Sequence, residues 1–209
     1  RRKLRLDDAP AHDWPPTDVE TTIRRYLMYV LLPGWLVPSV ADWWYHRRSH
    51  IEDTTGLKEA ALHTAMAVEV GVPVAVALTM RITRPVAGAM AAAALAHAAT
   101  ASWDVRIAYD SPREVTPGEQ HVHGFLEVLP LTSLATLAAL HWQQIVRPAP
   151  GQRAFSARRP PLPRWYLASA GTVTVAVIVG PYRDEMARCI RVWRRRRGAV
   201  AAGAVQPGT

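Results

Sequence analysis

The chain has 209 residues, a formal charge of +8 and an apolar fraction of 49%, values that allow one or two domains. Its basic residues mostly flank apolar segments, which suits lipid headgroups and argues against a nucleic-acid partner. The single cysteine, Cys189, excludes an internal disulfide. No apolar run lies within the first 20 residues, so we expect no cleavable signal peptide.

The N-terminal part of the chain changes from polar to apolar within a short distance. Residues 1–16 are polar and contain three prolines, which predicts a disordered arm. The T-x-x-E pattern at 17–20 is typical of a capping box and predicts the start of a helix. The first apolar run follows at 23–44 and contains Pro33 and Pro38, which a membrane helix can accommodate with a kink.

Three further apolar runs have the length of membrane helices, which need about 20 residues to cross ~30 Å of hydrocarbon. Gly56 marks the turn into the second run, 57–80, and the third run, 85–103, is rich in alanine and glycine, which favour close helix packing. A second T-x-x-E pattern at 116–119 predicts the start of the fourth run, 120–146.

The C-terminal part begins with a basic, proline-rich segment at 147–164, which is typical of a stiff linker. The fifth apolar run, 165–179, is short and would span a membrane if its helix extended to Tyr182. The sequence therefore predicts an all-α integral membrane protein with a four-helix bundle core and a fifth transmembrane helix. The predicted parts are the arm (1–16), the four-span domain (17–146), the linker (147–164), the fifth span with a basic helix (165–193) and a disordered tail (194–209).

Each of the four core runs carries one carboxylate and one imidazole near one end. Spacings of four and seven residues return a side chain to the same helix face. The ends of the first and third runs and the starts of the second and fourth lie on the same side of the membrane, so the pairs are expected to meet at one end of the bundle. The pairs are Asp42 with His46, Glu59 with His63, His97 with Asp104, and Glu119 with His123.

These residue types form the ligand set of iron, manganese and zinc. Helical bundles build two-metal carboxylate sites from acids and histidines that point inward. Four carboxylates would balance the charge of two divalent cations, and uncompensated charges near hydrocarbon are costly. We therefore expect these eight side chains to hold two divalent metal ions, with iron favoured and zinc or manganese as alternatives.

Single members of this set also have structural explanations. Glu119 could serve only as the acid of its capping box. Asp42 and Asp104 lie at predicted interfaces, where they could be hydrated or paired with a nearby arginine. His63 and His97 are the strongest members, because they sit inside apolar runs.

Other ionisable residues extend the candidate site. Glu69 lies in the middle of the second run, where it is expected to relay protons or to make a helix–helix hydrogen bond. Arg106 and Arg113, before the fourth run, could neutralise site acids or bind an anionic substrate. Additional candidate ligands are His50, Asp53, His121 and Glu127.

Two sequence segments carry a resemblance to known families. DWWYHRRSHIEDTTGLKEAALH, residues 42–63, together with EQHVHGFLEVLP, residues 119–130, resembles a family of small bacterial polytopic membrane proteins of uncertain biochemistry. The resemblance covers residues 21–146. Some members of that family are labelled diguanylate cyclases, but this chain has no GG[DE]EF-type segment and no glycine-rich phosphate loop.

More distantly, the histidine-rich apolar runs resemble the integral-membrane di-iron hydroxylases and desaturases. Those families use HxxxH and HxxHH boxes. Here His46 and His50 form one HxxxH pair, and HxxHH does not occur. H-E-x-x-H is also absent, which argues against a zincin-type protease.

The ligand types and their position favour a membrane metalloprotein with a di-iron site. Its expected activity is the O₂-dependent hydroxylation or desaturation of a lipid or other hydrophobic substrate, with a separate electron donor. The alternatives are zinc-dependent hydrolysis of a membrane lipid, haem binding through histidine pairs, and a non-catalytic membrane scaffold or sensor.

We expect a multi-pass protein of the bacterial inner membrane. The numbers of lysines and arginines on the two sides of five spans are nearly equal and do not set the orientation. The arginine run at 194–197 prefers the cytoplasm and, with five spans, shares a side with the acid–histidine pairs. The metal site is therefore expected to face the cytoplasm.

Overall fold

The computed structural model of the chain describes residues 16–202. Within that range the regular structure is helical, apart from an isolated bridge between Met80 and Ala157, so the all-α prediction is confirmed. The arm expected at 1–16, except for its last residue, and residues 203–209 of the expected tail lie outside the described residues.

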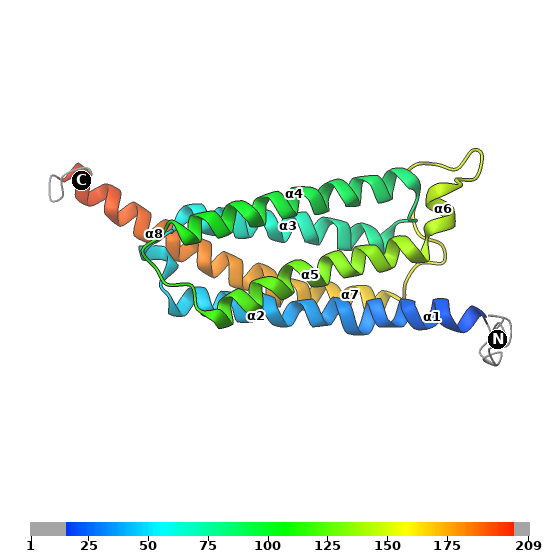
Figure 1. Ribbon diagram of the computed structural model, residues 1–209, viewed down its shortest axis with the longest axis horizontal. Helices are drawn as coiled ribbons and strands as arrows, with labels where there is room; N and C mark the ends of the chain where they lie inside the picture. Colours follow the sequence, from blue (N-terminus) through cyan, green and yellow to red (C-terminus); the bar gives the residue numbers. More distant parts are fainter. Residues whose placement is uncertain (1–15, 203–209) are drawn as a thin grey trace, which may run out of the picture.

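The first apolar run forms a single rod with a break in its hydrogen bonding. The π-helical turn of this rod lies directly before Pro33, whose missing N–H cannot continue a regular helical ladder. The three segments that follow one another along it (Figure 1) are α1 (Pro16–Tyr26), η2 (Leu27–Leu31) and α2 (Leu32–Arg48).

The remaining helices alternate in direction along the bundle. A 3₁₀ turn, η3 (Ile51–Asp53), leads to Gly56, whose φ of +60° favours glycine. As predicted, the Thr116 hydroxyl caps the start of the helix at Pro117–Leu140 by accepting a hydrogen bond from the Glu119 N–H at 3.2 Å. The elements after η3 are α3 (Leu57–Thr79), α4 (Arg84–Tyr109), α5 (Pro117–Leu140), α6 (Trp142–Val146), α7 (Arg164–Thr174), η4 (Val175–Val179) and α8 (Gly180–Ala201).

The long helices form a closed ring, in which each packs against two neighbours. The order around the ring is α2, α5, α4, α3 and α8, with α8 returning to α2. Figure 1 shows these helices running side by side along the long axis of the molecule. Helix α8 is therefore part of the bundle wall, between α2 and α3, so that its side chains can reach the interior.

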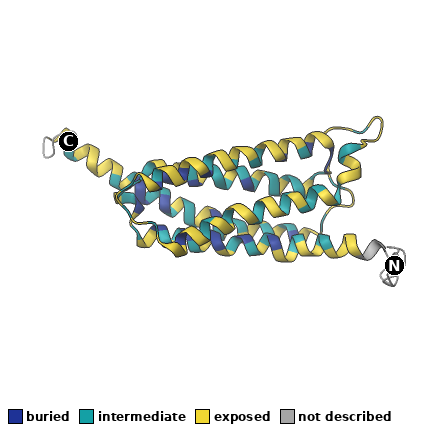
Figure 2. Ribbon diagram, viewed as in Figure 1, coloured by how far each residue is buried: buried dark blue, intermediate teal, exposed yellow. Residues whose placement is uncertain are grey.

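Among the described residues, four helices are long and apolar enough to cross a membrane: Leu57–Thr79, Arg84–Tyr109, Pro117–Leu140 and Arg164–Ala201. Figure 2 shows exposed positions along the outer faces of the long helices, and these include large apolar side chains such as Leu95, which is 75% exposed. Lipid would cover such a surface. The rod at 16–48 lies beside these four helices but is not among them, because its prolines and aromatic residues lower its mean hydropathy.

The linker segment packs on the turn between α3 and α4. The Thr83 hydroxyl donates a hydrogen bond to the Ala154 carbonyl at 2.6 Å, and the Arg158 N–H donates to the Thr79 carbonyl at 2.8 Å. These contacts place Arg158 at the end of the bundle opposite to the ends of α2 and α4.

A close helix contact gives a first prediction. Gly118, at the start of α5, lies against the Tyr45 side chain of α2, and a Cβ at that position would overlap the Tyr45 hydroxyl. Gly118→Ala should therefore displace the Tyr45 ring and destabilise the fold by about 1 kcal/mol, a small effect because Gly118 is exposed and the overlapping atom is the tip of a side chain. Thermal unfolding of the purified protein in detergent measures the loss.

The control for this substitution is Gly124→Ala in the same helix, where a Cβ would meet no atom within 4 Å. Because alanine is the better helix former, that variant should keep or raise the melting temperature. Equal melting temperatures for the two variants would show that α2 and α5 do not make this contact.

Candidate metal centre

Three acid–histidine pairs with a spacing of four residues point into the same end of the bundle. Asp42 and His46 come from α2, and Glu59 and His63 come from α3. All four are at most 2% exposed. The third pair, Glu119 and His123 in α5, adds a fully buried acid and an imidazole whose side chain is 14% exposed. The predicted convergence of these three pairs is present in the structure.

The imidazole of His46 lies at the centre of this group. Its Nε2 atom has no hydrogen-bond partner among the described residues. It faces three carboxylate oxygens, at 3.5 Å on Asp42, 3.6 Å on Glu119 and 3.8 Å on Glu59. These distances are too long for hydrogen bonds. They are close to the separation of ~3.0–3.5 Å between two ligands that bind one metal ion with bonds of ~2.1 Å.

His63 lies parallel to His46 and shares one facing acid with it, Glu59. The two rings stack with their centroids 4.4 Å apart and their planes at 6°. The His63 Nε2 atom is 3.4 Å from Asp104 Oδ1 and 3.9 Å from Glu59 Oε1. Within the described part of the chain, Asp104 Oδ1 and Glu59 Oε2 are buried without hydrogen bonds. Two imidazoles and two acids thus surround a second point that can accept a cation.

Glu185 in α8 forms hydrogen bonds with the Nδ1 atoms of His46 and His63. Its two carboxylate oxygens lie 3.1 Å from His46 Nδ1 and 2.7 Å from His63 Nδ1. An ionised carboxylate can only accept hydrogen bonds, so both Nδ1 atoms are the donors. In a neutral imidazole the lone pair then remains on Nε2, which is the atom that faces the acids. This is how outer carboxylates orient histidine ligands in metal sites.

Glu185 is not among the candidate ligands expected from the sequence, because it lies in the basic helix that follows the predicted fifth span. The signal was nevertheless present: Tyr182, Glu185, Met186 and Cys189 have the spacing of one helix face. Cys189 packs on Ile51 and Ala60. Ion pairs of Arg188 with Glu52, and of Arg47 with Asp184 at 3.0 Å, fix α8 in this register.

Arg113 closes the site from the loop between α4 and α5. Its guanidinium donates to Glu59 Oε1 and to Glu119 Oε1, both at 2.6 Å, and its side chain is only 3% exposed. Burial by itself would lower the pKa of Arg113, but the two carboxylates outweigh burial and raise it. Arg113 therefore neutralises site acids, while Arg106 is exposed on the surface of α4.

Charge is the dominant property of this group, which we call the acid–histidine cluster. If all five carboxylates are ionised and the histidines are neutral, these groups and the single guanidinium carry a net charge of −4, which two divalent cations would cancel. Each uncompensated buried charge costs several kcal/mol. Such a cluster has to be neutralised by protons or by metal cations. Its members are Asp42, His46, Glu59, His63, Asp104, Arg113, Glu119, His123 and Glu185.

The cluster contains two overlapping groups of possible ligands. Asp42, His46 and His123 form one, and His46, Glu59 and His63 form the other, each with ligand atoms within 4.8 Å of one another. The two groups share His46, whose Nε2 has one lone pair and can bind one ion. Two ions would therefore have to divide the ligands, with Asp42 and His123, 2.8 Å apart, on one side.

His97 lies outside both groups, although it was among the strongest expected ligands. Its Nδ1 atom is 3.6 Å from Glu69 Oε2, and the other Glu69 oxygen accepts a hydrogen bond from Thr100 at 2.9 Å. Glu69 thus links α3 to α4. His97 and Asp104 share a helix face, but seven residues separate them by ~10 Å along the axis, too far to bind one ion.

The remaining candidates also lie apart from the cluster. His50 is exposed beside Glu52, and Asp53 forms an exposed ion pair with Arg196 at 3.6 Å. His121 is exposed and contacts the edge of Phe125. Glu127 faces two cavities in the bundle interior, described below.

The role of Glu185 can be tested by removing its carboxylate. Glu185→Ala leaves both Nδ1 atoms without their acceptor, so the affinity for a divalent metal should fall about 10–100-fold. Competition with a chromophoric chelator measures this affinity. Glu114→Ala, in an exposed loop position, is the control and should bind as the unmodified protein does. An unchanged affinity in Glu185→Ala would contradict the orienting role.

Arg113 gives a second test, based on stability without metal. Arg113→Gln leaves Glu59 and Glu119 unpaired, and breaking a buried ion pair costs about 3–5 kcal/mol. The melting temperature of the chelator-treated protein should therefore drop by roughly 6 °C or more, and saturating Mn²⁺ should recover much of the loss. Arg106→Gln is the exposed control. A loss that metal does not recover would show that Arg113 acts through packing alone.

Comparisons of the chain with protein-family models, curated proteins and solved structures find no match. Within residues 16–202 the chain is helical, with four candidate membrane spans and a buried group of histidines and acids that could hold a metal ion.

Proposed function

We propose that the protein is an integral membrane metalloprotein in which the acid–histidine cluster holds two iron ions and oxidises an apolar substrate with dioxygen. One observation carries this proposal. Glu185 fixes the Nδ1 side of His46 and His63, so that both Nε2 atoms face carboxylate oxygens at 3.4–3.9 Å. A divalent cation between these atoms would bind both Nε2 atoms and the carboxylates that face them.

The charge of the cluster supports two ions rather than one. Two divalent cations cancel the net charge of −4, whereas a single ion leaves two negative charges in a buried site. The ligands can be divided accordingly. His46, His63, Glu59 and Asp104 would hold one ion, and Asp42 and His123 would hold the other, with Glu119, which faces His46, between the two positions.

A mixed set of imidazoles and carboxylates suits iron, and helical bundles use such sets for di-iron centres. Bound iron would supply the activation of dioxygen. The chain's own residues would hold the ions, with Glu185 orienting the imidazoles and Arg113 compensating the charge of Glu59 and Glu119 on the loop side. These roles match the chemistry expected from the resemblance to membrane di-iron hydroxylases, although the ligands here come in acid–histidine pairs.

The surroundings of the cluster favour an apolar substrate. A small cavity of about 50 Å³ touches Asp42, His63, Asp104 and His123 and is otherwise lined mainly by apolar and aromatic side chains. In a hydroxylation, one atom of O₂ enters a C–H bond of the substrate and the other leaves as water. This step consumes two electrons and two protons, for which we propose a separate one-electron donor protein.

We also propose that the cluster end faces the cytoplasm of a bacterial cell, with the spans in the inner membrane. The arginine-rich end of α8 projects from the end of the bundle that holds the cluster (Figure 1). Arginine-rich ends of membrane helices are retained on the cytoplasmic side.

A second candidate is zinc-dependent hydrolysis of a lipid. The group of His46, Glu59 and His63 has the two-histidine, one-carboxylate composition of catalytic zinc sites that activate water. Zinc in place of iron, and activity without O₂, would select this candidate over the first.

Metal analysis of the purified protein tests the proposal. We expect close to two iron ions per chain and O₂ consumption that depends on an electron donor. His123→Ala should lose one ion and the activity. His121→Ala is the matched control in the same helix, because His121 is exposed, and it should keep both. Less than one metal ion per chain in the unmodified protein would refute a metal centre.

A further inference from the structure

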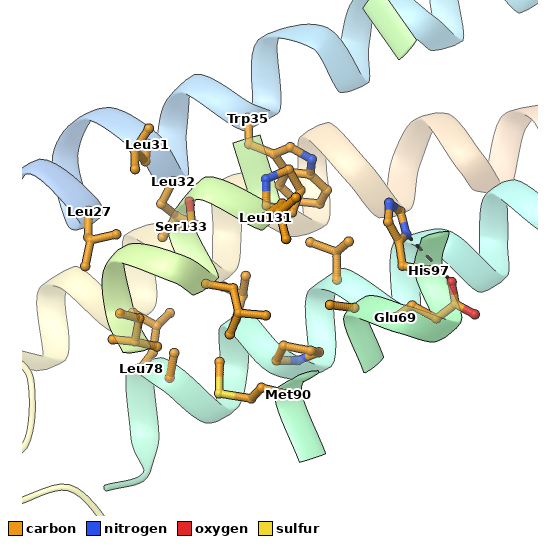
Figure 3. A pocket seen from close by; sticks show the side chains of 18 of the residues that line it. Leu27, Leu31, Leu32, Trp35, Glu69, Leu78, Met90, His97, Leu131 and Ser133 are labelled. Carbon is orange, nitrogen blue, oxygen red and sulfur yellow. Dashed lines mark ion pairs between the residues drawn. The ribbon is translucent and has the colours of Figure 1, made fainter. Parts of the chain in front are cut away.

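A long apolar cavity of about 330 Å³ lies inside the ring of helices. Figure 3 shows its wall, with Leu27 and Leu78 toward one end and Glu69 and His97 at the other. Its lining comes from the first rod, from α3, α4 and α5, and from the linker before α7. Most of these side chains are leucine, alanine, valine, proline or methionine. Such a wall fits a hydrocarbon chain and offers few partners to a polar molecule.

The cavity leads toward the acid–histidine cluster. It shares three lining residues, Trp35, His97 and Glu127, with the small cavity that touches the cluster. These three side chains form the wall between the two spaces. A chain in the long cavity would therefore end beside the metal ligands, separated from them only by this wall.

The far end of the cavity has a different character, because two arginines line it. Arg24 is paired with Glu20, but Arg158 has no acidic partner among the residues that the structure describes. Burial lowers the pKa of Arg158, and the positive charge of Arg24 lowers it further. An anion bound here would relieve both effects.

We propose that the long cavity binds one fatty acid, with its carboxylate at Arg158 and Arg24 and the end of its chain against Trp35, His97 and Glu127. The charge at one end and the apolar wall along the rest match an amphiphile of this kind. As the substrate, which rests on the proposed function, this fatty acid would be oxidised far from its carboxylate.

The length of the first rod sets the position of oxidation. Arg24 and Trp35 are eleven residues apart, which is ~16 Å by helix rise. An extended hydrocarbon chain advances ~1.25 Å per carbon, so about 13 carbons reach the wall. Acids with 16 or so carbons would place their last carbons beside the cluster, whereas an acid of eight carbons would fill only half of the cavity.

Binding to the metal-depleted protein tests the proposal without any catalysis. We would measure displacement of a fluorescent fatty acid from the detergent-solubilised full chain by palmitate, methyl palmitate, octanoate and lysophosphatidic acid. Palmitate should bind at least about 10-fold more tightly than its methyl ester and than octanoate. Equal binding of palmitate and its ester, or tighter binding of the phosphate-bearing lipid, would overturn the assignment of a fatty acid.

Two pairs of variants locate the site. Arg158→Gln should remove the preference for palmitate over its ester, while Arg159→Gln, next to it and outside the cavity lining, should keep it. Ala94→Phe places a ring inside the cavity and should weaken binding by at least about 10-fold. Ala92→Phe, on the exposed side of the same helix, should not. Equal effects within either pair would contradict binding in this cavity.

The outcomes for binding and for chemistry are separable. If the iron-loaded enzyme hydroxylates palmitate near its methyl end, both the cavity assignment and the proposed function hold. If palmitate binds with the expected variant pattern and is not oxidised, the proposed function fails and the binding site stands. If oxidation occurs near the carboxylate, the orientation of the chain in the cavity is wrong.

Discussion

The burial of five carboxylates at one end of an apolar bundle is the constraint on which the rest of this structure depends. Arg113 offsets one of these charges, and the remainder requires protonated histidines or bound cations. Glu185 pairs with the Nδ1 atoms of His46 and His63. Their Nε2 atoms therefore face other acids, at 3.4 Å or more. This geometry favours cations between the Nε2 atoms and the acids. Binding of a cation at this site would therefore raise the stability of the fold.

The closure of the ring by α8 is what makes this arrangement possible. Helices α2, α3, α4 and α5 supply the inner acids and imidazoles, and α8 supplies Glu185, which contacts the Nδ1 atoms of His46 and His63. The ion pairs of Arg188 and Asp184 with the first hairpin hold α8 in position. Changes in α8 should thus affect the acid–histidine cluster even though α8 supplies none of its inner side chains.

Polarity falls and rises again along the axis of the bundle. The cluster occupies one end, Glu69 and His97 follow toward the middle, and an apolar cavity extends to the arginines at the other end. This order suits an amphiphile that enters with its chain toward the cluster. The chain of such an amphiphile would then end between the helices, away from the polar ends of the bundle.

The sequence by itself determined the helices, the apolar runs and the three acid–histidine pairs with a spacing of four, because helix periodicity is local and four residues return a side chain to the same face. Only the tertiary structure decided which residues share one centre. His97 obeys the same periodicity as Asp104 but lies too far along the helix axis, and it pairs with Glu69 instead. Glu185 and the two contacts of Arg113 depend on how distant segments pack, and local spacing carries no measure of that packing.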